Sequence, residues 1–143
     1  MSMKKTKFYD KEEGKWVLID AKDKILGRLS VKIAKILTGK NSPRFTPNAI
    51  CGDKVVVINA KYIRVTGNKL EDKFYTKFSG YPGGDSKINL QDLSKKNPCV
   101  VLRHAIKGMV PKNWLGKQML RSLKIYPEGT HEQAAQVPQP IEV

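Results

Sequence analysis

Two strand-like segments separated by a helix-like segment constrain the fold of this chain most. Trp16–Ile19 is a short apolar run rich in β-formers that ends at Asp20, as expected of a buried strand. From Leu26 to Leu37, apolar residues recur at intervals of three and four, which is the spacing of an amphipathic helix. Lys54–Ala60 is a nearly continuous β-branched run, typical of a strand buried on both faces. Two such strands joined through a helix predict a βαβ unit, and therefore a parallel sheet in an α/β domain.

The predicted helix carries a column of basic residues on the side away from its apolar residues. Arg28, Lys32 and Lys35 fall within about 60° of one another when successive residues are placed about 100° apart. One side of this helix is therefore predicted to pack on the sheet, while the other presents cations.

A second helix with the same arrangement is predicted to begin after Asn113, which can cap it. Its core stripe is predicted to consist of Leu115, Met119 and Leu123. Its far side is predicted to carry Lys117, Arg121 and Lys124. One basic column is common on a solvated surface, but two in one chain favour contacts with phosphate groups.

The net charge indicates the class of partner. The chain has 27 lysines and arginines against 13 acidic residues, a formal charge of +14, and no lysine or arginine follows Pro127. A charge of this size points to a polyanion, either nucleic acid or an anionic membrane surface. The membrane alternative is weak because no apolar run approaches the roughly 18 residues of a membrane-spanning helix. The N-terminus has no apolar leader segment, so secretion is not expected.

Aromatic and basic residues are mixed in a strand-like segment, Lys73–Phe78, which a glycine-rich loop follows. This composition suits RNA, because aromatic rings can stack on unpaired bases while ammonium groups meet phosphates. Phe74 and Phe78 are nevertheless predicted to lie in the core. Lys77 and Tyr81 are predicted to lie on the surface.

The segment after the glycine-rich loop is predicted to be helical from Asn89 onward. Asn89 resembles a helix cap, and Asn97–Pro98 repeats the start signal, with proline suited to the first helical position. His104 lies in the second of these helices without a carboxylate or a second histidine nearby, so it is predicted to be a packed or hydrogen-bonded residue.

Catalytic motifs are scarce in this sequence. The turn after the first strand has a single glycine, Gly27, where a dinucleotide-binding loop needs GxGxxG, and no GxxxxGK[ST] motif occurs. The enzyme alternative is a metal-dependent nuclease in which Asp20 and Asp53 converge on Mg²⁺. Both aspartates serve equally well as turn or cap residues, which is their commoner use.

Metal, disulfide and cofactor sites are not expected either. Cys51 and Cys99 are far apart and lack a CxxC partner, and His104 and His131 are the two histidines of the chain. Two free thiols in a reducing compartment are the simpler interpretation.

Eleven short motifs in order and in register resemble one known family. They are Trp16–Ala21, Leu26–Leu29, Gly39–Lys40, Phe45–Pro47, Gly52–Asp53, Ile58–Ala60, Thr66–Lys69, Tyr81–Gly84, Lys107–Pro111, Leu115–Lys117 and Ala135–Gln136. Each motif alone is nonspecific, but together they resemble the ribosomal protein L13 family of the large subunit, in its bacterial or organellar form.

This resemblance implies a three-layer α/β/α fold on a four-stranded parallel sheet. It also implies a place in the large subunit of a cytoplasmic ribosome (an organellar ribosome stays open) and early participation in assembly. The implied partners are 23S-type rRNA and neighbouring large-subunit proteins, with messenger RNA as a further candidate. No cofactor, membrane or small-molecule substrate is expected. The predicted organisation is an N-terminal arm at 1–14, an α/β core at 15–126 and an extended C-terminal tail at 127–143.

The resulting hypothesis is a non-catalytic rRNA-binding protein, with a nuclease and a free RNA chaperone as alternatives. Both helical columns would bind phosphates, and Tyr81 would stack on a base or ribose. Further phosphate contacts are predicted for cations in loops and at element ends: Lys40, Arg44, Lys69, Lys73, Lys77, Lys107 and Lys112.

Overall fold

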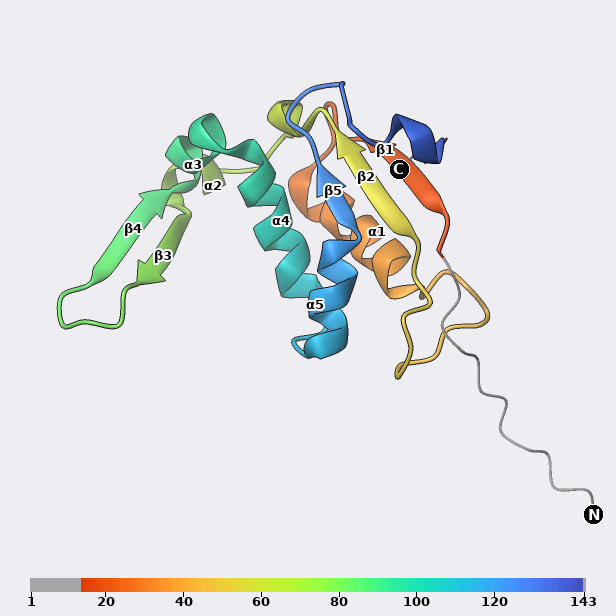
Figure 1. Ribbon diagram of the computed structural model, residues 1–143. Helices are drawn as coiled ribbons and strands as arrows, with labels where there is room; N and C mark the ends of the chain where they lie inside the picture. Colours follow the sequence, from red (N-terminus) through yellow and green to blue (C-terminus); the bar gives the residue numbers. More distant parts are fainter. Residues whose placement is uncertain (1–13, 143) are drawn as a thin grey trace, which may run out of the picture.

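A four-stranded, all-parallel sheet is the centre of the structure (Figure 1), a computed structural model that describes residues 14–142. The order of the strands is β5-β2-β1-β6. Their bounds are β1 Trp16–Asp20, β2 Lys54–Ile58, β5 Leu123–Ile125 and β6 Gln139–Pro140. The α/β class and the parallel sheet are therefore confirmed. Residues 1–13 of the predicted N-terminal arm lie outside the described residues.

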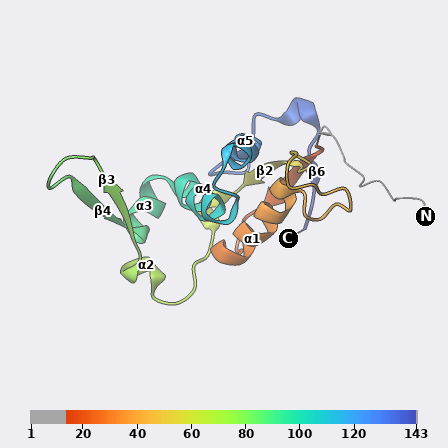
Figure 2. The ribbon, with the colours of Figure 1, turned by 90° about the horizontal axis from the view of Figure 1, so that it is seen from below.

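The helices and the second sheet are arranged around this centre. The helical segments are α1 Leu26–Thr38, η1 Ala60–Tyr62, α2 Lys69–Asp72, α3 Leu90–Lys96, α4 Pro98–Met109, α5 Trp114–Arg121 and η2 Ala134–Gln136. Strands β3 Phe74–Phe78 and β4 Asp85–Asn89 form a separate antiparallel hairpin. Seen from below, α1 and α5 lie on opposite sides of β2 (Figure 2).

The predicted βαβ unit is present with its apolar residues in the core. In β2, all three valines have no exposed surface, as expected of a strand covered on both faces. In α1, Leu29, Ile33 and Leu37 are buried against the sheet and α4. The helix ends at Thr38 and is capped by Gly39, which has a left-handed φ of 76° and donates its N–H to the Ile36 carbonyl.

The hairpin departs from the sequence prediction. Strand β4 was not predicted, and Phe74 and Phe78 are 56 % and 64 % exposed, so their assignment to the core was wrong. The hairpin projects away from the four-stranded sheet (Figures 1 and 2), and no described element covers its outer face. The aromatic and basic composition predicted the strand correctly, but composition cannot tell whether another layer exists to cover the aromatic side chains.

The junction of α5 and β5 is a second departure. Asn113 caps α5 as predicted, accepting a hydrogen bond from the Gly116 N–H at 2.9 Å, but the helix ends at Arg121. Leu123 fills the core from β5, not from the helix, and Lys124 alternates to the other face of the strand. The helical column Lys117, Arg121, Lys124 therefore does not exist as predicted, because the apolar spacing continues across a helix-to-strand junction.

The segment after β5 returns to the sheet. The Asn59 N–H donates to the Glu128 carbonyl at 3.1 Å, which holds the start of this segment near the end of β2. Strand β6 then pairs in parallel with β1, and the Ile141 N–H donates to the Leu18 carbonyl at 2.9 Å. The segment is thus tied to the sheet at both ends.

Candidate nucleic-acid interface

The basic column of α1 lies where the sequence predicted it. Arg28, Lys32 and Lys35 are exposed, while the apolar residues of the same helix, apart from the exposed Val31, are buried. The helix begins at Leu26, whose N–H donates to the Arg64 carbonyl at 2.9 Å. The packing of α1 on the sheet therefore orients this column outward.

Every residue of the predicted interface is exposed, including Tyr81 at 76 %. Arg44 set aside, the predicted cations have no carboxylate within 4.0 Å among residues 14–142. The Lys73 ammonium has an internal contact of another kind, 5.4 Å from the centre of the Tyr75 ring. Since carboxylates of the described chain do not neutralise these charges, they are available to an external anion.

Three predicted cations from two distant parts of the sequence line one open groove. It has a volume of about 1030 Å³ and runs between the first turn of α1, residues 65–69 and α4. Arg28, Lys69 and Lys73 line it, together with helical glycines Gly27 and Gly108. The cations of this groove thus come from α1 and from the two ends of α2.

Two smaller grooves continue the basic surface toward α5. The first, of about 490 Å³, is lined by Lys35, Lys40 and Lys112. The second, of about 370 Å³, is lined by Lys107, Lys112 and Lys117. Lys112 borders both grooves, so the basic surface beside α1 adjoins the one between α4 and α5.

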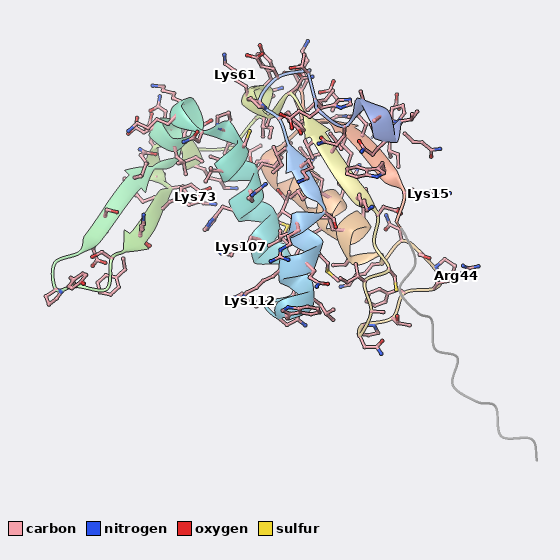
Figure 3. The ribbon with its side chains drawn as sticks, viewed as in Figure 1. Lys15, Arg44, Lys61, Lys73, Lys107 and Lys112 are labelled. Carbon is pink, nitrogen blue, oxygen red and sulfur yellow. The ribbon has the colours of Figure 1, made fainter. Side chains whose placement is uncertain are left out.

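Other predicted residues lie elsewhere. Lys77 and Tyr81 belong to the projecting hairpin. Arg44 lies in the loop between α1 and β2, on the side of the molecule opposite Lys73 and Lys107 (Figure 3). The candidate interface is thus a set of separate basic surfaces.

One cation beside the α1 column, Lys24, was not predicted from the sequence. Lys24 lines a hollow of about 250 Å³ with Arg28 and Lys32. It lies four residues before Arg28, so it continues the same spacing by one turn before the helix begins. The spacing itself could have identified it.

The two aspartates of the nuclease alternative do not converge. Asp20 ends β1, whereas Asp53 precedes β2, and the two strands are parallel with Trp16 opposite Lys54. The carboxylates therefore lie near opposite ends of the sheet. No group of three or more potential metal ligands occurs within residues 14–142.

Each aspartate has a structural role. Asp20 accepts hydrogen bonds at 2.9 Å from the Asn59 side chain and from the Lys22 N–H, and these bonds lower the pKa of its carboxyl group below 3.8. Asp53 accepts a 2.9 Å hydrogen bond from the Lys15 N–H. His104 is exposed, and its ring lies edge-on to the Tyr75 ring with the centroids 5.0 Å apart, so it is packed against an aromatic neighbour as predicted but is not buried.

Fold and surface together define a basic α/β domain with cationic grooves, a class suited to polyanionic partners. None of the described helices is long and apolar enough to cross a membrane. The chain belongs to the family described as Ribosomal protein L13, whose profile matches residues 14–132.

Relatives with known names are similar over most of their length. The chain is 53 % identical over 131 residues to the large ribosomal subunit protein uL13 of Thermus thermophilus, covering 92 % of this chain and 94 % of the relative. It is 50 % identical over 131 residues to the uL13 of Symbiobacterium thermophilum, covering 92 % of each chain. It is also 50 % identical to the uL13 of Nitrosomonas europaea, covering 90 % of this chain and 89 % of the relative. These findings do not support the nuclease alternative.

Proposed function

We propose that the chain is a structural constituent of the large ribosomal subunit that binds rRNA and takes part in early assembly of the subunit. Its membership of a ribosomal-protein family across residues 14–132 carries this proposal. The exposed basic surfaces support it, because rRNA is a polyanion that can neutralise a net charge of +14.

The mechanism is charge neutralisation at several separate surfaces of one protein. The α1 column and its grooves bind one region of rRNA, while Arg44 and the hairpin lie far enough away to reach others. RNA segments that approach the same protein repel one another less, because lysines and arginines replace part of their counterion atmosphere. Partners would include neighbouring large-subunit proteins. A messenger-RNA partner has no separate support in the structure.

Binding to large-subunit rRNA should depend steeply on salt. If roughly 6–10 phosphates are neutralised, affinity is expected to fall by about 10³–10⁵ between about 50 and 200 mM monovalent salt, by analogy with duplex binding. Filter binding or fluorescence anisotropy with transcribed rRNA across this range measures the slope. A nearly flat salt response would contradict the phosphate-binding mechanism.

Sedimentation of cell extracts separates a subunit component from a free RNA chaperone. We expect the protein to sediment with large subunits and their precursors and to stay bound through a second gradient at low salt. A chaperone would bind many RNAs with little preference and stay near the top of the gradient. Recovery of the protein mainly in the top fractions would overturn the proposed function.

A further inference from the structure

The outer face of the β3–β4 hairpin carries exposed aromatic rings that the fold does not use. In the antiparallel register, Thr76 lies opposite Lys87 and Phe78 opposite Asp85. Residues that lie opposite one another in two antiparallel strands have their side chains on the same face of the sheet. Every second residue along one strand also lies on that face. The outer face therefore consists of Phe74, Thr76 and Phe78 from β3 with Asp85, Lys87 and Asn89 from β4.

The opposite face of the hairpin is the one that contacts the protein. Tyr75 is half-buried against the core, and its ring meets that of His104 at 5.0 Å. Phe74 and Phe78 instead expose 56 % and 64 % of their surface, and neither has an aromatic or cation–π partner within residues 14–142. Two large rings left in water on one face of a sheet are a feature of binding surfaces.

The residues between the two rings favour RNA over an apolar protein partner. Phe74 and Phe78 are four residues apart on one strand, or about 13 Å, and the Thr76–Lys87 pair lies between them. A partner that covered both rings with apolar side chains would also bury the Lys87 ammonium, which is costly without a paired charge. An RNA strand offers a base to each ring and a phosphate to the ammonium.

We propose that this face binds unpaired bases of RNA, which stack on Phe74 and Phe78 while the connecting backbone crosses at Lys87. The inference rests on the proposed function and names the kind of RNA that one surface takes. Asp85, beside Phe78, repels phosphate and so directs the backbone toward Lys87. Stacking on phenylalanine tolerates every base, so the face selects single-stranded RNA with little sequence preference.

The test compares one RNA strand in two states with full-length protein. The probe is a short single-stranded RNA of mixed sequence that carries 2-aminopurine, used alone or annealed to its complement. Phe74→Leu and Phe78→Leu keep an apolar side chain but remove the π face. Each is expected to weaken single-strand binding by about 5- to 150-fold and to reduce the stacking quench of 2-aminopurine. Binding to the duplex should not change.

Two further variants separate stacking from general damage to the hairpin. Phe78→Tyr retains a ring and should retain single-strand affinity. Ile88→Ala removes a 40 % exposed apolar side chain from the opposite face and should leave both affinities unchanged. Both substitutions lie at exposed positions, where effects on stability are small.

The outcomes distinguish this inference from the proposed function. Wild-type protein that binds neither short RNA overturns the stacking surface, while the proposed function is judged separately by the sedimentation experiment. If the leucine variants bind the single strand as well as wild type does, the stacking surface is overturned and the proposed function stands. The same conclusion holds if those variants bind RNA normally but lose a protein partner. An equal loss on duplex and single strand, or an equal loss in Ile88→Ala, also overturns it.

Discussion

Replacing Arg28, Lys32 and Lys35 together by glutamine is expected to lower affinity for large-subunit rRNA by about 10²–10³-fold at about 0.1 M salt. Each lost phosphate contact removes about 0.9 from the slope of log affinity against log salt, so three contacts remove about 2.7. Anisotropy titrations at several salt concentrations measure both the affinity and the slope. The free energy of unfolding should stay within about 0.5 kcal/mol of wild type, because the three side chains are exposed.

A control with the same change of charge is available elsewhere on the chain. Lys61, Lys95 and Lys96 are exposed and lie outside the predicted interface. Their combined replacement by glutamine should reduce affinity far less than the α1 variant does. Equal losses in the two triple variants would show that net charge, and not the column on α1, governs binding.

Gly52→Ala is expected to destabilise the fold by about 3 kcal/mol or more, with a fall in Tm of about 10 °C. A Cβ at this position would lie 1.9 Å from the Leu37 carbonyl oxygen and 2.9 Å from that of Ile36. Both oxygens belong to the last turn of α1, and the Asp53 N–H donates to the Ile36 carbonyl at 3.2 Å. The chain must pass this close to enter β2, so the helix end would have to shift.

Gly108→Ala is the matched control for this stability prediction. Gly108 lies inside α4, and a Cβ there meets no atom within 4 Å. Alanine lowers the conformational entropy of the unfolded chain, so this variant should gain about 0.5–1 kcal/mol. Urea unfolding of both variants measures the difference. A Gly52→Ala protein as stable as wild type would mean that the end of α1 does not pack against this segment as described.

The centre of the fold could be predicted because its local and global signals agree. The apolar run of β1, the three-and-four spacing of α1 and the β-branched run of β2 each match the period of the element they form. The sequence alone could not show where each helix or strand ends, because the ends depend on how the element packs against the rest of the fold. The spacing through Leu123 looked helical because a buried strand residue followed the helix in phase, and β6 is too short to carry a pattern.

The sequence could predict which candidate-site side chains are exposed, but not which of them lie together in one groove. Helical geometry alone places Arg28, Lys32 and Lys35 on one side of α1. The meeting of Arg28 with Lys69 and Lys73 depends on how residues 65–69 and α4 pack beside that helix. The exposed face of Phe74 and Phe78 depends on the hairpin projecting beyond the sheet, which no local pattern encodes.

Lysine reactivity in assembled particles tests most directly whether the cationic side of α1 meets rRNA. Purified large subunits and the free protein are treated briefly with an amine-acylating reagent, and modification at each lysine is measured by mass spectrometry. Lys32 and Lys35 should react readily in the free protein, where both are exposed, and be strongly protected in the subunit. Equal reactivity of both lysines in the two samples, with protection confined to another surface such as that around Lys61, would contradict the account.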